Sequence, residues 1–314
     1  MILKFATKTK CRLRGLCGLW LIIVLMFLVS SCSRHEQQDG LLIAVSIPPQ
    51  AWFVSQIAGD KAGTLVIVSP GQNPHTYEPT PRQLQSLTTA SAWILSGLDF
   101  EISLLPRVEP LFPNLLIVDG TEGVELRLLE EPCLDCGAHN SHDHHVSLFN
   151  IDRHTWLGRE AAKILGRHIR DTLSRLDRDN EAFYHERYEN LVREIDNVFE
   201  ELKAVLAPLY GRSVFVYHSS FGYFLDEFGI RQEAVETGGS EPTPRQLNNL
   251  MARIIEERPA AIFVQTQFPI TAARTLANAV DAQLIELDPL AIDWLDNIRR
   301  MGVSLRSAVP AAMP

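Results

Sequence analysis

The stretch LLIAVSIPPQAWFVSQIAGDKAGTLVIVS, residues 41–69, decides the fold class of this chain. It holds two short β-rich runs, 41–46 and 64–69, on either side of a helix-like segment at 48–60. Strands that alternate with helices are typical of parallel βαβ units. The stretch therefore predicts an α/β lobe that begins near residue 41.

The same alternation continues along the chain and predicts a second α/β lobe. Residues 80–90 have a helical pattern, and helix-like stretches separate the later strand-like runs. These runs are 92–97, 213–217, 231–235, 261–265 and 283–287. We expect an N-terminal lobe over 41–156 and a C-terminal lobe over 209–314.

The segment between the lobes, 157–208, is expected to be a helical linker. Its two parts, 157–176 and 180–208, contain no proline before Pro208, and apolar residues recur at helical spacing in the second part. At 1.5 Å per residue the second helix would be about 40 Å long. A rigid helix of that length between two lobes limits their relative motion.

An internal repeat supports the division into two related lobes. The seven residues 78–84, EPTPRQL, recur unchanged as residues 241–247. In each copy the threonine is suited to cap a helix and the following proline to occupy its first position. We therefore expect equivalent helices in two pseudo-symmetric lobes, although coincidental capping chemistry is the alternative.

The first 31 residues have the pattern of a lipoprotein signal peptide. Basic residues without acidic ones precede an apolar run at 16–29, which is shorter than the roughly 20 residues of a spanning helix. Val29-Ser30-Ser31-Cys32 is similar to a bacterial lipobox, which implies cleavage before Cys32 and lipidation of its thiol. Residues 32–40 would be a tether that places the protein at the membrane surface.

Composition excludes one class of partner. The chain has 314 residues, of which 29 are basic and 38 acidic, for a net charge of −9. Nucleic-acid binding depends on clustered Lys and Arg, and no such cluster follows the signal segment. We therefore expect no nucleic-acid partner.

Four residues at predicted strand ends and loop mouths form a candidate metal site. They are His75, His154, His218 and Asp288. In open α/β sheets ligands bind beyond the carboxyl ends of the strands, and three imidazoles with one carboxylate suit tetrahedral Zn²⁺. A lone histidine at a strand end is often structural, so the hypothesis depends on all four meeting.

A catalytic role is the less favoured interpretation of this site. A zinc-dependent hydrolase requires an open coordination position and a general base, for which Glu78 and Glu241 are the candidates. Both glutamates directly precede helix starts, and a four-ligand site leaves no place for a catalytic water. We therefore expect a binding protein and no enzyme.

A second group of metal-binding side chains lies close together in sequence, at residues 133–145. It contains a cysteine pair and four histidines: Cys133, Cys136, His139, His142, His144 and His145. Such a tract is typical of weak auxiliary metal binding. The alternative is an inert loop closed by a Cys133–Cys136 disulfide, because a location outside the cytoplasm permits disulfides to form.

In the order and spacing of its motifs the chain resembles the metal-binding solute-binding lipoproteins of bacterial ABC transporters, and within them the zinc-uptake group (cluster A-I). The motifs are PHTYEPTPRQL, SAWILSGLDFE, DRHTWL, VYHSSFGYFLDEFGI, SEPTPRQL and LDPL. The resemblance implies two lobes joined by a rigid helix, a monomer on the periplasmic or cell-surface side, and delivery of one metal to an inner-membrane ABC permease. It also implies His75, His154, His218 and Asp288 as the ligands.

The resemblance favours zinc because the third ligand position, His218, is a glutamate in manganese binders. Delivery of Mn²⁺ or Fe²⁺ by the same fold is the alternative, and an additional adhesin role stays open. Two motifs depart from the family pattern. Arg153 stands where the family has proline before the second ligand, and Gln265 stands where it has glutamate.

Overall fold

The structure, a computed structural model, describes residues 40–129, 151–236, 244–257, 259–268 and 270–307. The chain divides into two units, Met1–Gly40 and Leu41–Pro314, and the fold described below belongs to the second. The expected signal segment 1–31 and nearly all of the tether lie outside the described residues. None of the helices in the described ranges combines the length and apolar character that a membrane span requires.

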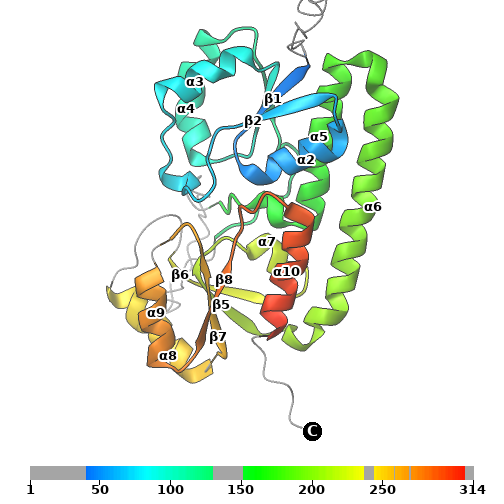
Figure 1. The fold of residues 1–314 in the computed structure, drawn as a ribbon. Helices are drawn as coiled ribbons and strands as arrows, with labels where there is room; N and C mark the ends of the chain where they lie inside the picture. The colour runs from blue at the N-terminus through cyan, green and yellow to red at the C-terminus, as the bar shows by residue number, and fades with distance from the viewer. Residues whose placement is uncertain (1–39, 130–150, 237–243, 258, 269, 308–314) are drawn as a thin grey trace, which may run out of the picture. The chain divides into compact units, whose positions relative to one another are not determined.

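The first lobe is built on a four-stranded parallel sheet in the order β2-β1-β3-β4 (Figure 1). Its strands are β1 (Leu41–Val45), β2 (Ala62–Val66), β3 (Ala92–Leu95) and β4 (Leu116–Asp119). Its helices are α2 (Pro48–Ala58), α3 (Pro81–Ser86) and α4 (Asp99–Leu111), with short 3-10 turns η1 (Pro74–Thr76) and η2 (Leu87–Thr89). The β1-α2-β2 unit confirms the prediction from residues 41–69.

The second lobe repeats this topology, with a parallel sheet in the order β6-β5-β7-β8. Its strands are β5 (Ser213–His218), β6 (Arg231–Glu236), β7 (Ala261–Gln265) and β8 (Gln283–Leu287). Its helices are α7 (Gly222–Asp226), α8 (Pro244–Glu257), α9 (Ile270–Ala279) and α10 (Trp294–Ser307). The equivalent strand orders confirm the prediction of two pseudo-symmetric lobes.

Each copy of the sequence repeat begins a helix at its second proline. Helix α3 starts at Pro81 and helix α8 starts at Pro244. In the first copy, the Thr80 hydroxyl accepts a hydrogen bond from the backbone N–H of Gln83, and the side-chain oxygen of Gln83 accepts one from the backbone N–H of Thr80. This is a capping box. Thr243, its counterpart, lies outside the described residues.

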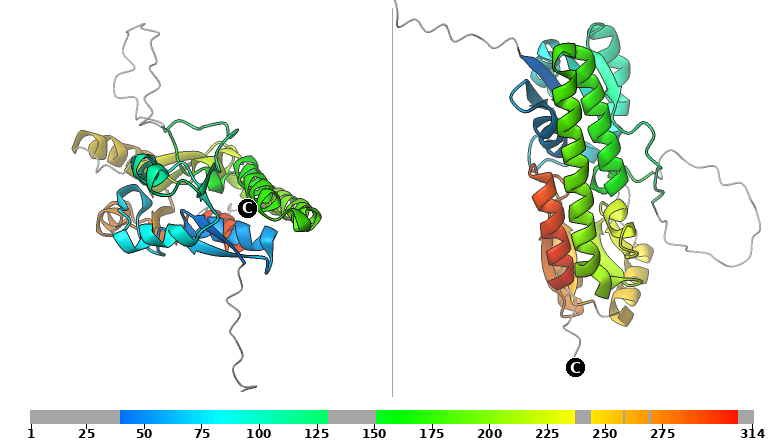
Figure 2. Two further views of the ribbon diagram at one scale, coloured as in Figure 1. Left: turned by 90° about the horizontal axis from the view of Figure 1, so that it is seen from above. Right: turned by 90° about the vertical axis from the view of Figure 1, so that its right-hand side faces the viewer.

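Helices α5 (Arg159–Leu176) and α6 (Glu181–Leu206) join the lobes, with turns η4 (Thr155–Leu157), η5 (Arg178–Asn180) and η6 (Ala207–Leu209). Helix α6 has 26 residues and is therefore about 39 Å long. It packs against α2 and α5 on the side of the first lobe and against α10 on the side of the second (Figure 2). The expected long helix between the lobes is thus present.

One apolar core runs through both lobes and the joining helices. It contains Val45 and Trp93 of the first sheet, Phe199 of α6, and Val216 and Trp294 of the second lobe, all buried. Burying a side chain of this size contributes roughly 1.5–3 kcal/mol. Because the lobes share this core, loops at their junction are held by packing from both sides.

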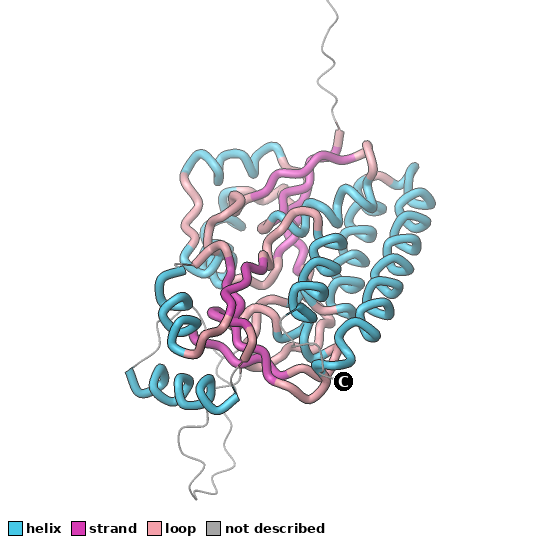
Figure 3. The backbone as a smooth tube through the Cα atoms, turned by 60° about the horizontal axis from the view of Figure 1, so that its bottom comes forward, coloured by secondary structure: helices cyan, strands magenta, loops and turns pink. Residues whose placement is uncertain are grey.

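Helices flank the strands of the second sheet (Figure 3). Apolar side chains pack on both faces of this sheet. On β5, Val214 and Val216 face the shared core, whereas Phe215 and Tyr217 face a second cluster formed with α8 and α9. Successive side chains of a strand point to opposite faces. The candidate ligand His218 follows the apolar run at the carboxyl end of this strand.

Two elements of the first lobe were not expected from the sequence, namely α4 and β4. Helix α4 contains Pro106 and Pro110, which remove backbone donors and normally end a helix. Its apolar residues Phe100, Leu104 and Val108 are nevertheless buried at helical spacing. Burial against the sheet therefore outweighs the unfavourable local preference.

Candidate metal centre

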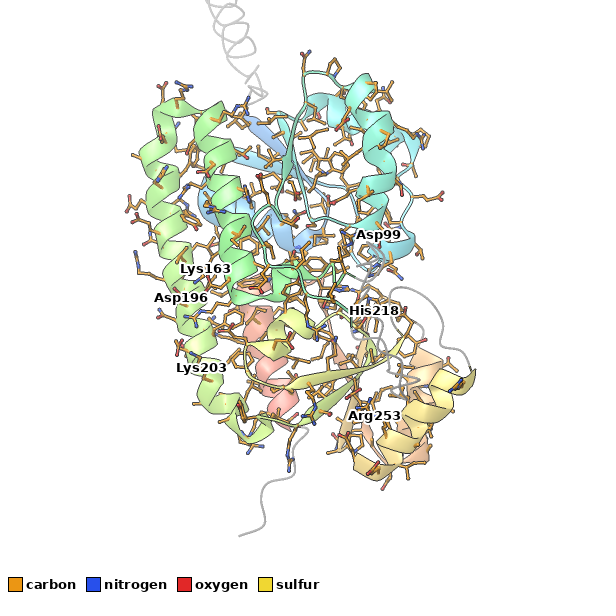
Figure 4. All side chains as sticks on the ribbon, turned by 180° about the vertical axis from the view of Figure 1, so that it is seen from behind. Asp99, Lys163, Asp196, Lys203, His218 and Arg253 are labelled. Carbon is orange, nitrogen blue, oxygen red and sulfur yellow. The ribbon has the colours of Figure 1, made fainter. Side chains whose placement is uncertain are left out.

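Three histidines from distant parts of the chain meet at the junction of the lobes. They are His75 in η1, His154 at the start of η4 and His218 at the end of β5, and their ligand atoms lie within 4.8 Å of one another. The Nε2 of His75 lies 3.4 Å from that of His154 and 3.1 Å from that of His218. Figure 4 labels His218 at this junction, with Asp99 of the first lobe close by.

Local hydrogen bonds hold the backbone of each histidine in place. The side chain of Asn73 accepts from the N–H of His75 at 2.9 Å, and Asp152 accepts from the N–H of His154 at 3.0 Å. Gln265 forms a two-sided clamp on His218: its oxygen accepts from the N–H at 3.1 Å, and its nitrogen donates to the C=O. Three separate loops are thereby positioned before any ion binds.

A carboxylate lies behind each imidazole ring. The Nδ1 of His154 is 2.8 Å from Asp152, that of His75 is 3.5 Å from Asp99, and that of His218 contacts Glu236 closely. A carboxylate accepts hydrogen bonds, so each pairing favours a proton on Nδ1. The lone pair is then on Nε2, the atom that faces the other two rings. This is the usual arrangement behind histidines that bind metals.

Burial keeps two of the rings neutral. Desolvation lowers the pKa of His154 to about 4, although Asp152 opposes this, and it also lowers the pKa of His218 against the opposing effect of Glu236. The contact with His75 lowers the pKa of Asp99, a half-exposed carboxylate. Neutral imidazoles beside charged carboxylates are the protonation states that a metal site requires.

The space between the three rings fits one small ion. The cavity is about 10 Å³, close to the room that one water-sized sphere occupies. With Zn–N bonds of 2.0–2.1 Å, two nitrogens of a tetrahedral site are about 3.3–3.4 Å apart. The observed Nε2 separations of 3.1 and 3.4 Å are close to that value.

Asp288, the fourth residue expected from the sequence, does not join this cluster among the described residues. Its Oδ1 accepts from the side chain of Gln267 at 2.8 Å and from the N–H of Leu290 at 2.9 Å. It lines a neighbouring cavity of about 580 Å³, whereas Gln267 lines both that cavity and the three-histidine pocket. The role of Asp288 as a direct ligand therefore stays a prediction.

Both departures from the family pattern have a structural consequence. The Nε of Arg153 lies 3.5 Å from Asp99, the carboxylate beside His75, so this arginine adds a charge contact that proline cannot make. The neutral Gln265 clamps the backbone of His218, while Glu236 on the neighbouring strand supplies the carboxylate to its ring. Glu236 was not singled out from the sequence, although it ends a strand parallel to β5.

A partly buried arginine completes the surroundings of His154. The guanidinium of Arg127 lies 3.5 Å from Asp152 and 2.7 Å from Asp226 on α7. A Cβ at Gly222 would meet that guanidinium at 2.5 Å, so a larger residue at this position would displace the arginine side chain. This arginine ties the carboxylate behind His154 to the second lobe.

Several candidate residues lie outside the described part of the chain. They are the lipidation residue Cys32, the cysteines Cys133 and Cys136, the auxiliary histidines His139, His142, His144 and His145, and Glu241. Glu78, the other candidate base, is exposed and does not belong to the three-histidine group.

Comparison with known proteins identifies the relatives of this chain. Residues 43–308 match the family described as zinc-uptake complex component A, periplasmic. The chain is 24% identical over 290 residues to the zinc-binding lipoprotein AdcA of Streptococcus pneumoniae strain R6, covering 90% of this chain and 55% of AdcA. It thus spans about half of the length of that relative.

Two further relatives bear on the metal. A crystal structure of a ZnuA deletion mutant with zinc bound superposes with a TM-score of 0.77 and 32% identity, covering 88% of this chain and 100% of that one. The manganese-binding lipoprotein MntA of Halalkalibacterium halodurans is 24% identical over 275 residues, covering 85% of this chain and 86% of MntA.

The family match covers most of the chain, and the relatives carry the names of zinc-uptake and metal-binding proteins. These relatives favour metal binding over the alternative of a zinc hydrolase. The chain belongs to the metal-binding solute-binding proteins of the zinc-uptake family.

Proposed function

We propose that this protein captures Zn²⁺ between its lobes and delivers it to an ABC importer in the inner membrane. The observation that carries the proposal is the convergence of three imidazole Nε2 atoms, on two buried rings and one partly buried ring, each ring with a carboxylate beside its Nδ1. Three neutral nitrogen donors in a space for one ion suit zinc. Ligands from both lobes make metal occupancy depend on lobe geometry, which a permease can sense.

Zinc titration of wild type and of His→Ala variants tests this proposal. We expect one tight site per chain in wild type, and loss of that site in His154→Ala and His218→Ala, because each removes a buried nitrogen donor. His185→Ala is the matched control, since this half-exposed histidine on α6 has only a 3.9 Å contact with Glu181. Equal zinc stoichiometry in all four proteins would exclude the three-histidine site as the binding site.

The alternative cargo is Mn²⁺ or Fe²⁺, and the similarity to a manganese-binding lipoprotein gives it support. Mn²⁺ prefers oxygen ligands, whereas imidazole suits zinc. Competition between Zn²⁺ and Mn²⁺ at equal concentration distinguishes the two proposals. Retention of Mn²⁺ against Zn²⁺ would favour the alternative.

The proposal also covers the location of the protein at the membrane and the histidine-rich segment at residues 133–145. Lipidation at Cys32 would hold the protein at the membrane surface without a spanning segment. The histidines of residues 139–145 would gather metal weakly beside the tight site. Deletion of 133–145 is then expected to lower the total metal bound while leaving one tight site.

A further inference from the structure

Two stretches of chain that precede α5 lie against helix α7 of the second lobe. One contains Arg127 and the other Asp152, and the N–H of Asp152 donates to the carbonyl of Arg127 at 2.8 Å. Asp152 is also the carboxylate that accepts from the backbone of His154 and contacts its ring. The position of this histidine therefore depends on how the two stretches are held.

The hydroxyl of Tyr223 on α7 makes the first link between that helix and the two stretches. It accepts from the N–H of Arg127 at 2.8 Å and donates to the carbonyl of Asp152 at 3.3 Å. A phenolic hydroxyl both donates and accepts, so the two hydrogen bonds are compatible with each other. Helix α7 thereby fixes backbone atoms of both residues.

The guanidinium of Arg127 makes the second link to α7. Its Nε donates to Asp226 at 2.7 Å, and its terminal nitrogen lies 3.5 Å from the Oδ2 of Asp152. The side chain of Asp152 is fully buried, and this Oδ2 has no hydrogen-bond partner among the described residues. A buried carboxylate that loses its cation is strongly unfavourable, so Asp152 depends on the position of this guanidinium.

The carboxylates beside the other two rings each belong to the same lobe as their histidine. These pairs are Asp99 with His75 in the first lobe and Glu236 with His218 in the second. By contrast, Asp152 is linked through Arg127 to Asp226 in the opposite lobe. A movement of α7 relative to the first lobe therefore reaches His154 through a chain of direct contacts.

We propose that Arg127 is a positioning residue that couples the placement of α7 to His154, and that separation of α7 from Arg127 loosens this histidine and lowers the affinity for the ion. The relay runs from Asp226 through Arg127 and Asp152 to His154. This inference rests on the proposed function and deepens it, because it names the contacts through which movement between the lobes changes zinc binding.

A double-mutant cycle in zinc affinity tests the relay, with competition against a chelator as the measurement. We expect Arg127→Met to weaken zinc binding about 10–100-fold, the range found when the outer partners of metal ligands are removed, and Asp226→Ala to weaken it about 10-fold. The double variant is expected to be no weaker than Arg127→Met, because both changes break one relay. Arg299→Met on α10, where the arginine contacts the exposed Glu201 and Asp296, is the matched control. Wild-type affinity in Asp226→Ala would overturn the proposal.

Two further variants separate bridging from simple charge balance. Arg127→Lys keeps the charge but lacks the planar fork that faces two carboxylates, so we expect it to recover only part of the affinity. Gly222→Ala changes no charge but places a Cβ 2.5 Å from the guanidinium, and we expect it to weaken zinc binding as well. Gly63→Ala is its control, because a Cβ there would meet only a methyl carbon of Leu42, at 3.4 Å. Full affinity in Arg127→Lys or in Gly222→Ala would overturn the bridging role.

Histidine NMR of the zinc-loaded protein provides a readout that a general loss of stability would not move. The Nδ1–H resonance of each ring reports the carboxylate that accepts from it. We expect Asp226→Ala, at a half-exposed position, to shift the resonance of His154 and to leave that of His218 in place. Equal shifts of both resonances, or no shift, would overturn the proposal. Unchanged affinity in the relay variants, with zinc binding still lost in His154→Ala, would exclude the relay and leave the proposed function standing.

Discussion

At the scale of single residues, buried carboxylates in this protein lie in different surroundings, and these surroundings determine how each one behaves. Asp152 and Glu236 are buried next to the imidazoles of the candidate metal site, whereas Glu101 is buried at the start of α4. Its two oxygens accept from the N–H groups of Ser96 at 2.9 Å and Leu98 at 2.8 Å. Despite these hydrogen bonds, burial raises the pKa of Glu101 to about 7 from its ordinary 4.5.

This raised pKa predicts a pH dependence of stability. Between pH 4.5 and 7 the folded chain holds a proton on Glu101 that the unfolded chain has lost, so stability falls as pH rises through this window. The change amounts to roughly 3 kcal/mol at 1.36 kcal/mol per pKa unit. Glu101→Gln cannot ionise, and the stability advantage of wild type over it is expected to be larger at pH 4.5 than at pH 8.

Urea unfolding of both proteins at the two pH values measures this difference. Glu109→Gln on the same helix is the control, because Glu109 is exposed and its substitution should leave the pH dependence unchanged. A stability difference between wild type and Glu101→Gln that stays constant with pH would contradict the prediction.

At the scale of elements, the close packing of α10 on α6 joins the second lobe to the long helix. Gly302 on α10 faces Leu202 on α6, and a Cβ at Gly302 would lie 2.4 Å from a Leu202 methyl carbon. Leu202 is itself buried in the shared core. The glycine therefore permits a helix approach that any side chain would obstruct.

Gly302→Ala is accordingly expected to destabilise the protein. Overpacking costs typically 1–3 kcal/mol, which exceeds the gain of up to about 1 kcal/mol that alanine brings in helix propensity. Denaturant unfolding measures the net loss, which we expect to be about 1–2 kcal/mol. Val303→Ala, at the exposed neighbouring position, is the control. A Gly302→Ala protein as stable as wild type would show that α10 moves away from α6 without cost.

At the scale of the whole molecule, the candidate metal site brings together parts of the chain that are far apart in sequence. His75 belongs to the first lobe and His218 to the second, and the core that supports both is shared. An ion that binds only the folded chain stabilises it by mass action, about 4 kcal/mol at a thousand times the dissociation constant. Metal binding should therefore stabilise the whole described fold.

Calorimetry with excess Zn²⁺ and with a chelator tests this coupling. We expect zinc to raise the unfolding temperature by roughly 2–4 °C for each kcal/mol of binding free energy. His154→Ala is expected to lose the increase and His185→Ala to keep it. An equal increase in both variants would place the stabilising zinc elsewhere on the chain.

The sequence alone determined the alternation of strands and helices, the long joining helix and the relation between the lobes. These features depend on local periodicity, on capping residues such as Thr80, and on a repeat that is visible without coordinates. Helix α4 escaped prediction because Pro106 argues against a helix locally, while burial of Phe100 and Leu104 favours it only in the folded chain.

Tertiary structure alone decided how the candidate site is assembled. The sequence indicated which histidines to compare, but not that Glu236 on a neighbouring strand faces His218, nor that Gln267 lies between Asp288 and the pocket. Such contacts join residues tens of positions apart and depend on strand order and helix packing. Local pattern carries no information about them, because the distances are set by how the shared core packs.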